Sequence, residues 1–184
     1  MSAPVSDEVT QPGLHRNPEF LKLWAAQSVS VLGSAVTQLA LPTAAILTLH
    51  ANPFEVGALA ALQRLPFIFF SLHAGAILDR INRRPVMIAC DVGRAAVLAS
   101  VPIAAVLGHL GLWHLFIAAF LVGAMTVFFD VAYLAYLPAL ISRADLMGGN
   151  QRLQMTYSVA NLVGPGIAGI LIQLIGAAQA ITAN

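Results

Sequence analysis

Residues 113–137 read WHLFIAAFLVGAMTVFFDVAYLAYL, and Asp130 is the only charged side chain in this stretch. A helix that crosses a bilayer needs about 20 consecutive, predominantly apolar residues. Four other stretches are similarly long and apolar, namely residues 21–49, 55–78, 86–107 and 153–175. The sequence therefore predicts an all-α integral membrane protein, a transmembrane helix bundle of about five spans within residues 20–176.

The composition of the whole chain agrees with this prediction. Of its 184 residues, 59% are hydrophobic and only 9% are charged, whereas a soluble domain contains roughly 25% charged residues. A net charge of +1 offers no basic face for nucleic acid. The single cysteine, Cys90, excludes a disulfide framework and a thiolate metal site. We expect the lipid bilayer as a partner, and no nucleic acid, metal or cofactor.

The segments around the spans predict how the chain is divided. The first residues differ from a cleavable signal peptide, because Asp7 and Glu8 stand where such a peptide has a basic region and the apolar run that follows is too long. We interpret residues 1–19 as a cytoplasmic tail and residues 177–184 as a truncated approach to a sixth span. Turn-forming residues separate the spans at Asn52-Pro53, Asn82 to Pro85, Gly108 to Gly111 and Gly148 to Asn150.

The basic residues predict the orientation of the bundle. Those outside the spans or at their ends all fall on one side of it: Arg16, Lys22, Arg80, Arg83, Arg84, Arg143 and Arg152. The loops at 50–54 and 108–112, on the other side, contain none. Because cytoplasmic loops carry an excess of Lys and Arg, we expect a multi-pass plasma-membrane protein whose amino terminus is cytoplasmic.

Four charged residues fall deep inside the predicted spans, away from their ends, namely Arg64, Asp91, Arg94 and Asp130. A charge at the bilayer centre costs at least ~2.5 kcal/mol, so such residues usually face the bundle interior or water. Arg94 and Asp130 should lie at similar depth on antiparallel helices that rise about 1.5 Å per residue. We hypothesise that Arg94 pairs with Asp130, with Asp91 nearer the cytoplasm. Such a pair could also serve only to orient the two helices.

The first span carries a polar stripe, formed by Gln27, Ser30, Ser34, Thr37 and Gln38. These side chains fall on one face of a helix, which indicates the wall of an aqueous cavity. Polar side chains in membranes also form hydrogen bonds between helices, and the stripe could do this instead. The candidate cavity residues are Gln27, Ser34, Gln38, Arg64 and Asp130.

Residues 75–84 read GAILDRINRR. The order is a Gly, three residues, Asp-Arg, two residues and two basic residues. It resembles the signature loop between spans 2 and 3 of the major facilitator superfamily, in which Gly usually stands at the position of Asn82. In that family the loop latches the two halves of the transporter in the outward-facing state. The resemblance implies a cytoplasmic-gate role for Gly75, Asp79, Arg80, Arg83 and Arg84.

Residues 160–169 read ANLVGPGIAG. This segment is similar to the span-5 motif of the superfamily's antiporters, a Gly, three residues, Gly-Pro, two residues and Gly-Gly. Gly164, Pro165 and Gly169 match the motif, whereas Ala160 and Ala168 stand in place of two glycines. The resemblance implies an antiporter. The same small residues could also serve close helix packing with no bearing on the direction of transport.

The resemblance covers nearly the whole chain and extends to a bacterial branch of drug and siderophore exporters. It implies the first half of a twelve-span transporter fold, alternating access, and energy from the proton gradient. We interpret the chain as part of a secondary active transporter that exports a small molecule in exchange for protons. Its partners would be that substrate, protons and a missing carboxy-terminal half, in a bacterial cell membrane.

Two other classes of protein are alternatives to this interpretation. An intramembrane enzyme would need a cluster of aspartates for two metal ions, and only Asp91 and Arg94 resemble part of one. We therefore expect no catalytic residues and no enzyme activity. A non-transporting membrane protein or an inactive truncated remnant stays an alternative, because five spans do not complete a two-half architecture.

Overall fold

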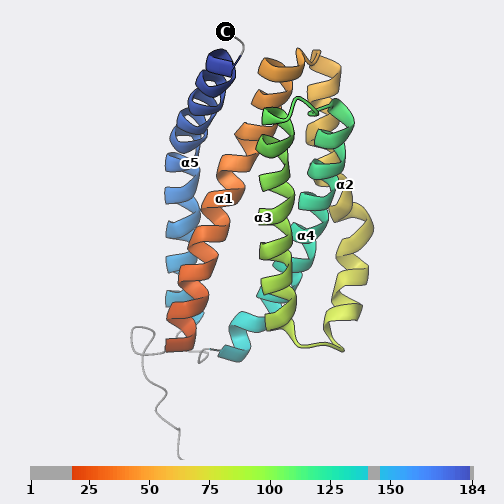
Figure 1. Ribbon diagram of the computed structural model, residues 1–184. Coiled ribbons are helices and arrows are strands. Elements are labelled where there is room, and N and C mark those ends of the chain that lie inside the picture. Colours follow the sequence, from red (N-terminus) through yellow and green to blue (C-terminus); the bar gives the residue numbers. More distant parts are fainter. Residues whose placement is uncertain (1–17, 141–145, 183–184) are drawn as a thin grey trace, which may run out of the picture.

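The computed structural model describes residues 18–140 and 146–182, and Figure 1 shows them as a bundle of helices. The helices are α1 (Pro18–Leu49), α2 (Pro53–Leu78), α3 (Arg83–Val106), α4 (Leu112–Leu140) and α5 (Leu146–Thr182). They run alternately up and down, so that α1, α3 and α5 all begin at the same end of the bundle (Figure 1). We call this the Pro18 end. The predicted all-α bundle is confirmed.

Four of the described helices are long and apolar enough to cross a membrane. They are α1, α2, α3 and the Leu112–Tyr136 part of α4. This supports a multi-pass membrane protein. The helix α5 has 37 residues and runs beside α1 in Figure 1, but its assignment as a fifth span stays a prediction.

Local sequence explains the sharp turns at the far end of the bundle. The Asn52 side chain accepts a hydrogen bond from the Glu55 N–H at 3.0 Å, and the Asn52 N–H donates to the Glu55 carboxylate at 2.8 Å. This capping box satisfies two N–H groups that the helix leaves free. Pro53 follows at the first position of α2, where its missing N–H costs nothing. After α3, Gly108 adopts φ +70°, a conformation that favours glycine.

The boundaries of α5 differ from those predicted. Residues 148–150 lie inside its first turns and do not form a loop. Glycine weakens a helix by only about 1 kcal/mol, so it marks a boundary less reliably than proline does. Residues 177–182 continue α5 as far as Thr182, and their role as an approach to a sixth span stays a prediction. The predicted tail up to residue 17, and the loop around Arg143, lie outside the described residues.

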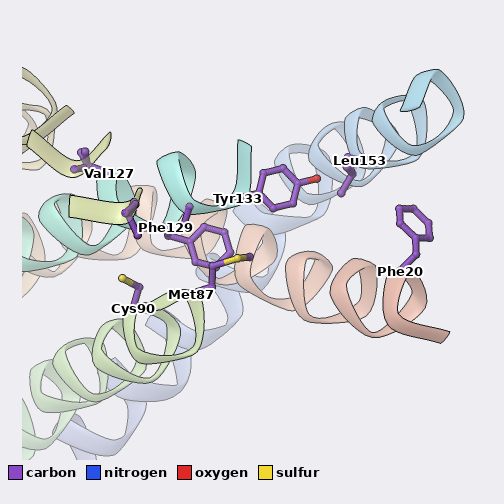
Figure 2. Close-up of a cluster of buried hydrophobic side chains, with 10 residues drawn as sticks. Phe20, Met87, Cys90, Val127, Phe129, Tyr133 and Leu153 are labelled. Atoms are coloured by element: carbon purple, nitrogen blue, oxygen red, sulfur yellow. The ribbon is translucent and has the colours of Figure 1, made fainter. Parts of the chain in front are cut away.

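The helices pack as two groups. The central helix α4 packs against α2 and α3, while α5 packs against α1. Contacts between α1 and the α2–α4 group are fewer. Figure 2 shows a cluster of buried side chains toward the Pro18 end, where Phe20 of α1 and Leu153 of α5 join Met87, Cys90 and others from α2–α4. A second cluster, which includes Leu59 and Leu115, fills the opposite end. Between the two clusters, polar groups of α1, α3 and α4 contact one another.

Two glycines let helices approach closely. A Cβ at Gly123 of α4 would overlap the main-chain carbonyl of Gln63 on α2. A Cβ at Gly164 of α5 would lie 2.7 Å from the Cβ of Ala35 on α1. Small residues at such crossings allow the backbone-to-backbone packing that holds membrane helices together. These contacts fix the helices that surround the site.

Candidate functional site

A cavity of about 950 Å³ lies among α1, α2, α3 and α4. Its volume falls within the range of about 300–1,000 Å³ that small-molecule sites occupy. The polar and charged residues that line it are Ser30, Ser34, Thr37, Gln38, Gln63, Arg64, Asp91, Arg94, Thr126 and Asp130. Phe67, Ile68 and Leu98 are among the apolar ones. Its charged residues, Arg64, Asp91, Arg94 and Asp130, are the four that lie away from the ends of the predicted spans.

Arg94 is the centre of a polar network. Its Nη2 donates to the Asp91 carboxylate and, at 2.6 Å, to the Ser30 hydroxyl. Its Nη1 donates to Thr126 Oγ1 at 3.4 Å, and its guanidinium lies 4.8 Å from the centre of the Phe129 ring. The side chain is only 7% exposed, and these groups compensate its buried charge. The network joins α1, α3 and α4.

The predicted pairing of Arg94 with Asp130 is wrong. The structure places no hydrogen bond or ion pair between them and instead pairs Arg94 with Asp91, one turn earlier on α3. On α4 it is Thr126 and Phe129 that face the guanidinium, which turns the neighbouring Asp130 toward the cavity. Asp130 is half-buried and forms no hydrogen bond or ion pair with any described residue.

The polar stripe of α1 divides between two environments. Ser34 and Gln38 line the cavity. Gln27 does not, and this differs from the expectation: it is 2% exposed, and its Nε2 donates to the Tyr157 hydroxyl of α5 at 3.2 Å. The stripe is wider than the cavity wall, so one edge of it faces the neighbouring helix. Gln27 therefore forms a hydrogen bond between helices, which was the alternative to a place in the cavity wall.

Arg64 lines the cavity from α2. It is exposed and has no hydrogen bond, ion pair or ring contact with any described residue. Phe67 and Ile68 follow it on the same face of the helix and line the same cavity. Sequence alone does not single out these two, because apolar residues at such positions usually face lipid.

At the Pro18 end, residues of the predicted gate loop contact one another, α4 and α1. The Asp79 carboxylate lies 3.8 Å from the Arg83 guanidinium, which also donates to the Ala135 carbonyl of α4 at 3.3 Å. Arg84 lies 3.4 Å from the Glu19 carboxylate of α1. Arg80 is exposed at the turn, and a Cβ at Gly75 would meet nothing within 4 Å among the described residues.

The residues of the span-5 motif fall on different faces of α5. Gly164 is buried against α1, and so are Ala160 and Ala168, which replace two glycines of the motif. Pro165 and Gly169 are exposed. The indole N–H of Trp24 on α1 also donates a hydrogen bond of 3.0 Å to the Thr156 hydroxyl of α5. One face of the motif therefore packs α5 on α1, and the other is open.

Comparisons with known proteins identify the family. Residues 13–184 match the model of transmembrane secretion effectors, a family of the major facilitator superfamily. The chain is 31% identical over 154 residues to macrolide efflux protein A of Streptococcus pyogenes. The aligned stretch covers 83% of this chain and 38% of that protein. It is 29% identical over 167 residues to multidrug efflux pump Tap of Mycolicibacterium fortuitum, covering 88% of this chain and 40% of that protein.

A further relative is the uncharacterized MFS-type transporter YfiS of Bacillus subtilis, with 28% identity over 167 residues, 86% of this chain and 37% of that protein. The chain thus spans well under half the length of the curated relatives that it matches. No solved structure matches it. With its family model matched over nearly all of its length, the chain belongs to the transmembrane secretion effector family of major facilitator superfamily transporters.

Proposed function

We propose that the chain is part of a secondary active transporter that exports a small molecule in exchange for protons by alternating access. The observation that carries this proposal is the cavity of about 950 Å³, lined by four charged residues within an apolar bundle. Charges inside a membrane protein are costly and mark substrate or ion pathways. Relatives named as macrolide and multidrug efflux proteins support the outward direction.

Asp130 is our candidate for the residue that carries the coupling proton. Asp91 is held by Arg94 and by the Ser30 hydroxyl at 2.9 Å, so a change at Asp91 would break a fixed network. Asp130 faces the same cavity without such partners among the described residues. A carboxylate without fixed partners can exchange a proton, or a basic group of a substrate, at little structural cost.

The Pro18 end is our candidate for the cytoplasmic face, because the loop between α2 and α3 lies there with Arg80, Arg83 and Arg84. We assign this loop to the cytoplasmic gate. The Asp79 side chain is 77% exposed, and its contact with Arg83 is loose at 3.8 Å. It is therefore available to a partner in another conformation of the transporter.

The remainder of the transporter would close the cavity. Residues 20–176 form one wall in this proposal, with α5 as a fifth span, and a carboxy-terminal half supplies the other. The relatives are more than twice as long as the stretch that they share with this chain, which leaves room for such a half. The open face of α5, with Pro165 and Gly169, is a candidate for contact with it.

The proposal is tested by efflux from cells. The complete native polypeptide that contains these residues is produced in a bacterial strain that lacks its main drug exporters, and ethidium or labelled erythromycin is loaded. We expect energised cells to lose the compound faster than vector controls, and a protonophore to abolish the difference. D130N should also abolish the difference from the vector control, whereas D7N, the same substitution in the amino-terminal tail, should not. Efflux equal to the vector control for both compounds would contradict the proposal.

A further inference from the structure

Arg64 lies at the middle of a membrane-spanning helix. The helix α2 has 26 residues and begins at Pro53, so Arg64 is ~17 Å along a helix of ~39 Å, at about 1.5 Å per residue. Side chains near helix ends reach the headgroups by snorkelling, but a position at mid-depth is too far away for this. Its charge therefore needs a partner inside the cavity that it lines.

The charges of the cavity do not all compensate one another. Arg94 and Asp91 form an ion pair and share the Ser30 hydroxyl, so this pair is neutral as a unit. Arg64 and Asp130 are left over, one cation and one anion, and the structure gives neither a hydrogen bond nor an ion pair with a described residue. The two side chains come from α2 and α4, which are held together where Gly123 meets Gln63, next to Arg64.

We propose that the substrate is amphoteric, with an anionic group that binds Arg64 and a basic group that binds Asp130. This rests on the proposed transport function. A guanidinium binds a carboxylate or phosphate through two parallel N–H bonds, so an oxyanion is the group that fits it best. Beside Arg64, the exposed Phe67 and Ile68 provide apolar area for a ring system. The substrate is thus an apolar body that carries both charges.

The same arrangement explains how export is linked to protons. A basic group of the substrate and a proton compete for the one carboxylate of Asp130, so binding of either favours release of the other. The anionic group at Arg64 takes no part in this exchange. It adds affinity and selects among basic compounds, which makes Arg64 a specificity residue.

The test uses a pair of dyes that differ at one group. Rhodamine B carries a xanthylium cation and a carboxylate, and its ethyl ester carries the cation alone. Binding of each dye to the purified complete polypeptide in detergent is measured by fluorescence anisotropy. We expect the wild type to bind rhodamine B about tenfold more tightly than the ester, as the loss of one charged hydrogen-bonding pair implies. R64Q should bring this ratio to about one.

Three further variants separate the roles. R64K should keep part of the preference, because it retains the charge but loses the two-bond geometry. R152Q, the same substitution as R64Q at a residue that does not line the cavity, should leave the ratio unchanged. D130N should weaken binding of both dyes by a similar factor. A variant is compared only if its size-exclusion profile and thermal midpoint match those of the wild type.

The outcomes distinguish this inference from the transport function. Equal binding of the two dyes to the wild type, no binding of either, or an unchanged ratio in R64Q would overturn the amphoteric substrate. The last result would indicate that an acidic residue elsewhere in the polypeptide pairs with Arg64. Efflux of ethidium, which has no anionic group, could still be normal in each case, and the proposed function would then stand without this inference.

Discussion

Asp91 and Arg94 form an ion pair one turn apart on α3, and Asp130, on the facing helix α4, is left outside it. The pair is at mid-depth in the bundle, with Arg94 11 residues after the first residue of α3, which has 24. Its hydrogen bonds to Ser30 and Thr126 connect three helices. The network should therefore contribute to the stability of the bundle.

We expect D91N to lower the free energy of unfolding by about 3 kcal/mol, because it leaves the buried Arg94 charge without its anion. The double variant D91N/R94Q should lose less than D91N does, since both charges are then absent. D130N should change stability by less than about 1 kcal/mol, because it breaks no hydrogen bond or ion pair to a described residue. Unfolding in mixed SDS micelles measures all three. Equal losses in D91N and D130N would contradict the network.

The contact between α2 and α4 gives a second prediction. G123A should destabilise the bundle by about 1–3 kcal/mol, because the new methyl group would overlap the Gln63 carbonyl and push the helices apart. G57A is the matched control on α2, where an added Cβ meets nothing within 4 Å. It should be neutral or slightly stabilising, as alanine favours a helix more than glycine does. The same unfolding assay applies, and equal effects of the two substitutions would argue against close packing at Gly123.

The gate loop gives a third prediction. D79N should slow efflux about tenfold, the effect of losing one charge-assisted contact of roughly 1.5 kcal/mol. Its amount in the membrane should stay normal, because the Asp79 side chain is 77% exposed and supports no packing within the described bundle. Ethidium efflux is divided by the protein detected on a membrane blot, with D7N as the control. An unchanged rate per molecule would remove Asp79 from the gate.

Most of the fold could be predicted from sequence. The apolar runs and turn residues predict α1 to α4 to within three residues at either end, because membrane helices must satisfy their backbone groups internally. The boundaries of α5 could not be predicted so well. Gly148 and Gly149 look like a break in the sequence, yet the helix tolerates them and begins at Leu146.

The members of the site were easier to predict than their contacts. A charge in an apolar run stands out, so Arg64, Asp91, Arg94 and Asp130 could be identified from the sequence pattern alone. Their partners depend on the rotation of each helix, which the sequence does not define closely. The side chains of consecutive residues on α4 point in directions about 100° apart around the helix axis. This is the difference between Phe129, which covers Arg94, and Asp130, which faces the cavity.

Contacts across α5 were the least predictable part. The hydrogen bond from Gln27 to Tyr157 joins residues on two helices far apart in sequence, and nothing in either segment indicates the other. Only the small residues of α5 gave a signal, because a run such as Ala160, Gly164 and Ala168 is typical of a helix that packs closely on a neighbour. The structure places these three against α1.

The central claim, that Asp130 couples substrate export to proton movement, is tested most directly by proton flux. The complete native polypeptide is reconstituted into vesicles that contain a pH-sensitive dye, and ethidium is added on the side from which it is transported. We predict a proton movement opposite to that of ethidium, in proportion to the ethidium moved, and its absence in D130N. Ethidium transport without proton movement, or a flux in D130N equal to that of the wild type, would contradict the account.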